Sequence, residues 1–197
     1  MSNTMRSRSA GLLAGLLVLG TALAGCGVQP TAAKTTASVA APAAATTPAA
    51  ALQSAPAFQV PDVQGQTVSV PAGKPVVLLF GAASGCASCA VSEQQMAQVY
   101  PQFKHQAEFV TVDVTPGDTR ADVLSFAQQL GATWPAVLAQ GTNLLTLYHV
   151  SALDTMYVLN ARGQIVAHSD TGLSPRQLRA ALQKALRPTG SGGGVSA

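Results

Sequence analysis

Charge is scarce in this chain of 197 residues. Only 10% of its residues are charged, against about a quarter in an ordinary soluble protein, and the net charge is +3. If Arg6 and Arg8 are removed with the N-terminal segment, as argued below, nine basic residues remain against eight acidic ones. A chain so close to neutral has no electrostatic footprint for nucleic acid, so we expect no nucleic-acid partner.

Aromatic residues and cysteines are also few. One Trp, three Tyr and five Phe are too few for a platform on which single-stranded bases stack. Three cysteines are too few for a disulfide-stapled miniprotein, and a chain of this length does not need staples. Apolar residues make up 48% of the chain, so we predict one ordinary domain with a core of its own.

The first 25 residues are organised like a secretory signal. Arg6 and Arg8 precede a charge-free apolar stretch at residues 10–24, shorter than the roughly 20 residues of a membrane span. The stretch ends in Leu-Ala-Gly before Cys26, which resembles the lipobox of bacterial lipoproteins, where the cysteine sulfur takes a diacylglycerol. We predict a lipoprotein signal peptide at 1–25 and a lipid anchor at Cys26 on the extracytoplasmic face. The alternative is a plain signal peptide with an incidental cysteine.

Low-complexity segments flank the predicted domain. Residues 26–55 are mostly Ala, Thr, Pro and Ser with the single charge of Lys34, a composition that cannot offset its ordering entropy by burial. We predict a disordered tether there, a domain at 56–188, and a flexible glycine-rich tail at 189–197.

Between the flanking segments the pattern is that of a mixed α/β sheet. Continuous apolar runs predict buried strands at 76–80 and 109–114. A helix is expected from residue 86 to 100 or 105, with Pro101 kinking or breaking it. The other expected elements are a hairpin at 58–70, a helix at 122–130 stopped by Gly131, a short strand at 136–138, a short helix at 144–149, a hairpin at 156–168, and a last helix from Ser174-Pro175 to residue 186.

The motif that carries chemistry is Cys86-Ala-Ser-Cys89, between a predicted buried strand and a predicted helix. Unpaired N–H groups at a helix start stabilise an anion, and the thiolate is the reactive form of cysteine. We predict that Cys86 is the exposed attacking thiol and Cys89, one turn further, the buried resolving thiol. Thiols at this spacing can close a reversible disulfide.

Three other interpretations of the cysteine pair compete with the redox one. A structural disulfide usually joins distant segments, whereas this pair closes almost no loop. Zinc needs about four ligands, and the sequence has no second CxxC and no histidine pair. Two inert buried cysteines are the third alternative. The strand–CxxC–helix context favours redox chemistry without any cofactor.

Several segments then resemble, in order, the thioredoxin fold in its membrane-tethered TlpA/ResA-like branch. The matching segments are 73–77 (GKPVV), 86–89 (CASC), 110–114 (VTVDV), 134–138 (WPAVL), 148–163 and 173–175. The resemblance covers residues 56–188 and implies a mixed sheet flanked by helices. Members of this branch are exported thiol:disulfide oxidoreductases, often reducing specific partners, as in cytochrome c maturation. It therefore implies extracytoplasmic protein thiols or disulfides and a membrane electron donor or acceptor as partners.

The chain departs from this branch around its cysteines. Gly85 and Ser88 stand where the family usually has Trp and often has Pro. The family's cis-proline, which faces the cysteines, falls on Asp154. A cis peptide is costly without proline, so we expect a trans Leu153–Asp154 bond or a rearranged loop. A carboxylate at residue 154 would face Cys86 and disfavour its thiolate.

A second acid, Glu93, is a candidate for tuning the site. The family's acid three residues after the second cysteine is Ser92 here, with Glu93 one position further. Glu93 lies about one helical turn past Cys89 and could relay a proton, but a solvated glutamate on the helix surface is the favoured interpretation.

Two alternative functions remain open on the sequence. Thiolates select soft ions such as Cu(I), and Asp154 or His149 could join the cysteine pair as a metal ligand. A thioredoxin-like domain could also dock to a partner without catalysis. The main expectation is an exported, lipid-anchored thiol:disulfide oxidoreductase.

Overall fold

The computed structural model describes residues 52–188. The predicted signal peptide at 1–25, the predicted lipidation site Cys26, nearly all of the predicted tether at 26–55 and the predicted tail at 189–197 lie outside these residues. No helix within the described range is long and apolar enough to cross a membrane.

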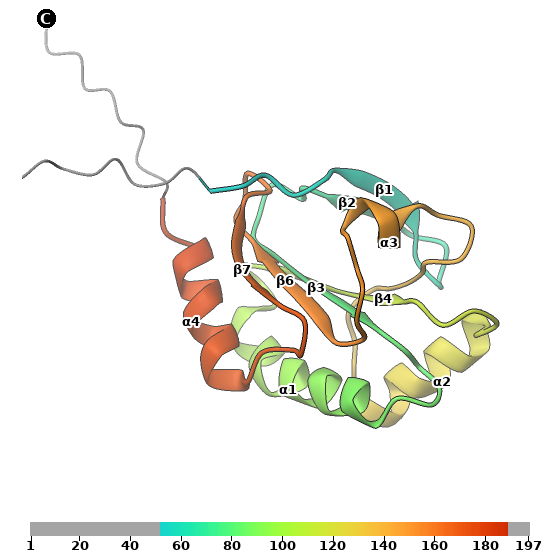
Figure 1. Ribbon diagram of the computed structural model, residues 1–197. Coiled ribbons are helices and arrows are strands. Elements are labelled where there is room, and N and C mark those ends of the chain that lie inside the picture. The colour runs from blue at the N-terminus through green and yellow to red at the C-terminus, as the bar shows by residue number, and fades with distance from the viewer. Residues whose placement is uncertain (1–51, 189–197) are drawn as a thin grey trace, which may run out of the picture. The chain divides into compact units, whose positions relative to one another are not determined.

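A mixed five-stranded sheet is the centre of the domain, with the strand order β5-β4-β3-β6-β7 (Figure 1). Its strands are β3 (Val76–Gly81), β4 (Glu108–Asp113), β5 (Ala136–Leu138), β6 (Thr155–Leu159) and β7 (Ile165–Ser169). β3, β4 and β5 are parallel, whereas β6 is antiparallel to β3 and β7 to β6. The predicted mixed sheet is confirmed, with strand ends that differ by a residue at most.

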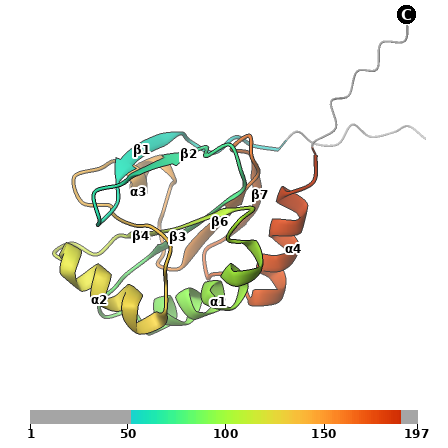
Figure 2. The ribbon, with the colours of Figure 1, turned by 180° about the vertical axis from the view of Figure 1, so that it is seen from behind.

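A separate hairpin of β1 (Phe58–Pro61) and β2 (Thr67–Val70) lies on one side of the sheet, as predicted. The short helix α3 (Leu144–Leu147) lies on the same side, whereas α1 (Ala87–Phe103), α2 (Arg120–Leu130) and α4 (Pro175–Ala185) lie on the other (Figures 1 and 2).

Alternating side chains of β3 build the two cores. Val77 and Leu79 pack with buried residues of α1 and α4, while Leu78 and Phe80 pack with Tyr148 and the hairpin side. A strand covered on both faces requires apolar residues at every position, which is why this run is continuous in the sequence.

The helices depart from their predicted limits for local reasons. The helix α1 continues past Pro101, because Phe103 is buried in the core and holds the last turn. The helix α2 starts at Arg120, earlier than predicted, because Thr119 and Asp122 form a capping box. Gly131 ends it with a φ of 69°, as predicted. The short α3 ends at residue 147 and α4 at residue 185, slightly earlier than expected.

The first described residues pair with the β6–β7 hairpin. The Ile165 N–H donates to the Gln53 carbonyl, and the Ala55 N–H donates to the Gly163 carbonyl, each at 2.8 Å. Residues 53–55, which were assigned to the disordered tether, are therefore part of the domain, ahead of its predicted start at residue 56.

The strand register brings three segments together at one edge of the sheet. Gly81, at the carboxyl end of β3, pairs with Asp113 of β4, and the neighbouring Phe80 pairs with Thr155 of β6. The loop that leaves β3 leads directly into the cysteine motif. The cysteines, the end of β4 and the residue before β6 consequently meet at this edge.

Candidate functional site

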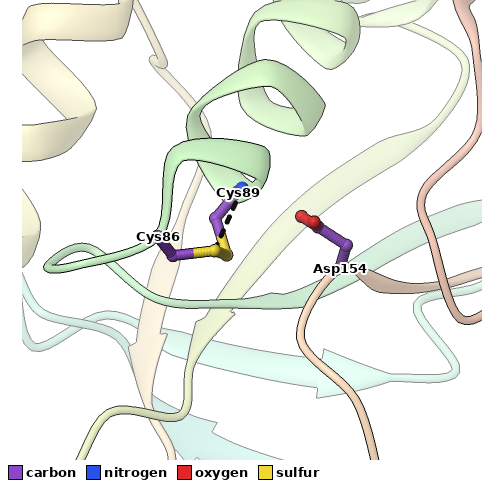
Figure 3. Close-up of side chains that lie close together, drawn as sticks. All are labelled: Cys86, Cys89 and Asp154. Carbon is purple, nitrogen blue, oxygen red and sulfur yellow. Dashed lines mark hydrogen bonds between the residues drawn. A yellow bond between two sulfur atoms is a disulfide. The ribbon is translucent and has the colours of Figure 1, made fainter.

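Cys86 and Cys89 form a disulfide at the start of α1, with an S–S distance of 2.06 Å (Figure 3). Cys86 is the N-cap residue, and its sulfur accepts a hydrogen bond from the Cys89 N–H at 3.1 Å. Cys86 is partly exposed, whereas Cys89 is 0% exposed. This difference in exposure fits an attacking and a resolving thiol, and the two roles remain predictions.

Asp154 takes the place opposite the cysteines (Figure 3). A carboxylate oxygen of Asp154 and the two cysteine sulfurs lie within 4.8 Å of one another, although the side chain is only 5% exposed. The residue has a φ of 69°, in the left-handed region that Asp tolerates better than most residues. The one cis peptide bond within residues 52–188 is Val70–Pro71, so the Leu153–Asp154 bond is trans, as expected.

The Asp154 backbone is fixed while part of its carboxyl is left without a partner. The Gly172 N–H donates to the Asp154 carbonyl at 2.7 Å, which holds the loop against the β7–α4 connection. The Oδ1 atom is buried and has no hydrogen-bond partner among the described residues. A buried acceptor of this kind is available to a group that approaches the disulfide.

Glu93 is buried, contrary to the interpretation as a solvated helix residue. Its side chain is 3% exposed, and its Oε1 atom accepts a hydrogen bond from the Thr111 hydroxyl at 2.5 Å. The Trp134 indole N–H in turn donates to the same hydroxyl oxygen at 3.0 Å. Burial raises the pKa of Glu93 to about 7, and the Thr111 hydrogen bond opposes this rise only in part.

A small cavity is lined by both Glu93 and Cys89. Its volume is about 10 Å³, the room that one water molecule needs. The other lining groups are mostly apolar, so the buried thiol and the buried carboxyl share a low-dielectric space. The Glu93 Oε2 atom has no hydrogen-bond partner within the described part of the chain.

The sequence analysis missed a further acid at the site, Asp113. Its Oδ2 atom accepts a hydrogen bond from the Ala83 N–H at 2.6 Å, and its Oδ1 atom accepts one from the Thr115 N–H at 3.1 Å. The pKa of Asp113 is raised to about 6, chiefly by burial, although the backbone hydrogen bonds oppose the rise. Asp113 therefore anchors the loop that leads from β3 into Cys86.

A second acid supports the same loop. The Ser84 hydroxyl donates to Asp118 at 2.5 Å. The sequence contains one signal that could have identified this support: Asp113 ends a buried apolar strand, beside the strand that leads into the cysteines. Carboxyl ends of adjacent parallel strands meet at one edge of a sheet, where loop residues form sites.

Within residues 52–188, fewer side chains than predicted lie close enough together to bind one metal ion. The group of side chains close enough to hold one ion consists of Cys86, Cys89 and Asp154. His149 does not belong to it and has an exposed side chain. The cysteines would have to be reduced before they could bind a metal, because only the thiolate is a ligand.

Comparisons with known proteins agree with this geometry. The family model described as the AhpC/TSA family matches residues 51–168. The chain is 32% identical over 123 residues to "Mercury resistance operon ORF3" of Streptomyces lividans, covering 60% of this chain and 64% of that protein. It is 33% identical over 115 residues to the thiol-disulfide oxidoreductase ResA of Bacillus subtilis, covering 57% and 63%. The chain thus spans slightly less than two thirds of each of these relatives.

A solved structure extends the likeness to the fold. The domain resembles a thiol:disulfide interchange protein of the thioredoxin family from Chlorobium tepidum, with a TM-score of 0.62 and 21% sequence identity. The match covers 71% of this chain and 99% of that one. At this identity the likeness establishes the thioredoxin-like fold that the sequence motifs predicted.

Proposed function

Because the chain belongs to the AhpC/TSA family and its domain has the fold and CxxC disulfide of thiol:disulfide oxidoreductases, we propose that the whole protein exchanges disulfides with extracytoplasmic proteins. The observation that carries the proposal is the Cys86–Cys89 disulfide at a helix start, with one sulfur partly exposed and the other buried.

In the reducing direction the reaction has two steps. The Cys86 thiolate attacks a disulfide of the partner, a mixed disulfide forms, and the partner's other sulfur leaves as a thiolate that takes up a proton. Cys89 then loses its proton and attacks the Cys86 sulfur. The Cys86–Cys89 disulfide forms and the partner's second thiol is released. Two electrons and two protons from a dithiol electron donor at the membrane restore the reduced pair.

Glu93 is suited to take the proton from Cys89. The carboxyl and the thiol line one cavity with room for about one water molecule, so a proton can pass between them through a single water. With a pKa of about 7, Glu93 can both accept and release a proton near neutral pH.

An assay with the full chain tests the activity. The reduced protein is expected to reduce insulin disulfides, and Cys86→Ser is expected to abolish this. Cys89→Ser is expected to accumulate a mixed disulfide with the partner, because the intermediate cannot resolve intramolecularly. A Cys89→Ser protein that traps nothing, together with faster alkylation of Cys89 than of Cys86 in the reduced protein, would show that the roles are reversed.

Export and lipid anchoring are a second part of the proposal. They are supported by the basic residues near the N-terminus, the apolar stretch at 10–24 and the Leu-Ala-Gly sequence directly before Cys26. Cys26→Ala is expected to move the protein from the membrane fraction to the soluble fraction while the CxxC pair keeps its activity. Continued membrane association of Cys26→Ala would mean that an uncleaved apolar stretch is the anchor.

A second candidate function rests on the group formed by Cys86, Cys89 and Asp154, whose ligand atoms lie within 4.8 Å of one another. After reduction, two thiolates would bind a soft ion such as Cu(I). Titration of the reduced protein with Cu(I) under a competing chelator tests this function. Loss of Cu(I) binding in Cys86→Ser would support this function. A wild-type protein that binds Cu(I) no more tightly than Cys86→Ser would exclude it.

A further inference from the structure

Five of the eight basic side chains within residues 52–188 lie at the end of the domain opposite the disulfide. We define this basic end by five side chains, which are Lys74, Lys104, Arg162, Lys184 and Arg187. Lys74 lies before β3, Lys104 follows α1, and Arg162 lies in the β6–β7 turn. Lys184 lies in the last turn of α4, and Arg187 follows that helix. All of them except Lys74 are exposed to solvent.

Among residues 52–188, one acidic side chain lies at this end. Glu108, the first residue of β4, lies here, and it forms an ion pair with Lys74 at 2.6 Å. The buried acids lie at the disulfide end instead, because Asp154 is close to both cysteine sulfurs and Glu93 and Asp113 line a cavity together with Cys89. The domain therefore has a charge asymmetry along its length although residues 52–188 contain as many basic as acidic residues.

The basic end is also hollowed. Lys74, Arg162 and Arg187 line an open groove of about 490 Å³, together with the polar side chains of Gln106 and Asn160. These cationic side chains can attract the phosphate of a lipid headgroup, while Pro75, Ala161 and Leu186 add apolar surface to the same groove.

The chain that leads to Cys26 enters the domain at this end. The Gln53 and Ala55 backbones pair with Ile165 and Gly163, which directly follow Arg162 in the β6–β7 turn. Twenty-five residues separate Cys26 from Leu52, a length that spans at most about 90 Å even when fully extended. A lipid on Cys26 would consequently keep the basic end within reach of the membrane surface.

We propose that the basic end docks on the anionic phospholipid headgroups of the membrane that holds Cys26; this rests on the proposed lipid anchor. Each Lys or Arg near such a surface contributes to the attraction, and the field decays within a Debye length. The helix α1 has 17 residues and runs from the disulfide toward the basic end, so Cys86 is held about 25 Å from the docked surface. The partners of Cys86 are then proteins whose disulfides lie at about the same distance from the bilayer surface.

Hydrogen exchange of the full lipidated chain on vesicles tests this orientation. Vesicles that contain phosphatidylglycerol are compared with vesicles of phosphatidylcholine alone. We expect amide exchange in segments 104–106, 161–163 and 184–187 to slow by at least about tenfold on the anionic vesicles, and the slowing to disappear in about 0.5 M NaCl. Exchange around Cys86 is expected to stay unchanged.

Two matched charge reversals, one at and just beyond the end of α4 and one near its start, make the test specific. Lys184→Glu/Arg187→Glu alters the basic end, and Arg176→Glu/Arg179→Glu makes the same change in charge near the start of the helix. The first pair is expected to abolish the slowing and the second to retain it. Equal exchange on both lipids, or equal loss in both variants, would overturn the proposal.

The mass of the Cys26 peptide separates this proposal from the anchor on which it rests. A lipidated Cys26 with no slowing at the basic end would overturn the orientation and leave the anchor intact. An unmodified Cys26 would show that the proposed anchor is wrong. The same comparison of vesicles and variants would then decide whether the basic end binds anionic lipid.

Discussion

Glu93 and Asp154 are acidic side chains in places where an apolar residue would cost the fold less. Each is at least nine-tenths buried, and each leaves one carboxylate oxygen without a hydrogen-bond partner among the described residues. Burying a charge without full compensation destabilises a protein. Both residues lie beside the disulfide, so the cost in stability is concentrated where proton and electron transfer would take place.

The raised pKa of Glu93 predicts how stability depends on pH. The folded protein keeps the Glu93 proton up to a pKa of about 7, whereas the unfolded chain releases it near 4.5. The free energy of unfolding therefore falls as pH rises from 4.5 to 7 and levels off above pH 7, with a total loss of about 3 kcal/mol. Glu93→Gln keeps an oxygen for the Thr111 hydroxyl but carries no charge, so it should abolish this loss. Urea unfolding of the oxidised protein between pH 4.5 and 8 measures it.

A control variant and the pH dependence expected from Asp113 make that experiment specific to Glu93. Glu108→Gln changes a partly exposed glutamate and should leave the loss above pH 4.5 in place. Asp113, with a pKa raised to about 6, should maintain a smaller decline below pH 6 in both variants. If Glu93→Gln and the wild type lose equal stability up to pH 7, Glu93 is not the titrating group.

Asp154 should act on the reactivity of Cys86 through its charge. Its carboxylate lies within 4.8 Å of both sulfurs, and a nearby negative charge disfavours a thiolate. Asp154→Asn keeps the size and tolerates the φ of 69°, whereas Pro would lock φ near −65° and alter the loop. We expect Asp154→Asn to move the alkylation profile of Cys86 in the reduced protein to lower pH by about one unit. Superimposable profiles would show that the carboxylate does not influence the thiol.

At the scale of elements, the site depends on how closely the β7–α4 connection approaches α1. A Cβ atom on Gly172 would lie 2.5 Å from the Ser92 hydroxyl, and Gly172 has a φ of 72°. The same glycine donates the hydrogen bond that holds the Asp154 carbonyl. This single contact therefore links the loop, the start of α1 and the residue that faces the disulfide.

Gly172→Ala tests this link. Gly141 has a similar φ of 76° with no atom within 4 Å of an added Cβ, so Gly141→Ala reports the backbone cost alone, about 1–2 kcal/mol. Gly172→Ala should lose about 1–3 kcal/mol more from the clash and should change the alkylation rate of Cys86. Adding Ser92→Ala removes the clashing oxygen and should restore both. A double variant no better than Gly172→Ala would mean that the loop is not packed in this way.

The elements were predictable from the sequence wherever burial alone decides them. The apolar runs of β3 and β4 and the capping signals at Gly131, Ser174 and Pro175 produced the expected elements. Pro101 left the end of α1 open between residues 100 and 105, and the helix continues to Phe103 because burial of this side chain outweighs the hydrogen bond that proline removes.

The site was predictable only in part, because its second layer depends on contacts between distant segments. The CxxC pair and the position of Asp154 follow from the motif and its spacing. The burial of Glu93 depends on Thr111 and Trp134, which reach it from β4 and the α2–β5 connection. The spacing of residues along α1 does not show whether side chains from other elements cover Glu93. Asp113 was missed although its place at the end of a buried apolar strand was a signal in the sequence.

At the scale of the whole molecule, the redox couple and the folding equilibrium are linked. Whatever favours the disulfide over the dithiol in the folded state, relative to the unfolded chain, stabilises the oxidised form against unfolding by the same amount. Asp154 and the complete burial of Cys89 disfavour thiolates in the folded protein, whereas the start of α1 favours one at Cys86. The difference in stability between the two forms therefore reports which influence dominates.

We expect the oxidised protein to be more stable than the reduced protein by about 2 kcal/mol, in the direction of a reducing couple, because two of the three influences disfavour a thiolate. Urea unfolding with and without a reductant measures the difference, and each 1.4 kcal/mol places the folded couple about 30 mV below the unfolded one. The Cys86→Ser/Cys89→Ser double variant should unfold identically under both conditions. A reduced form that is the more stable one would show that the helix start dominates at Cys86. The protein would then be poised to oxidise its partners, and the electron flow proposed above would run in the opposite direction.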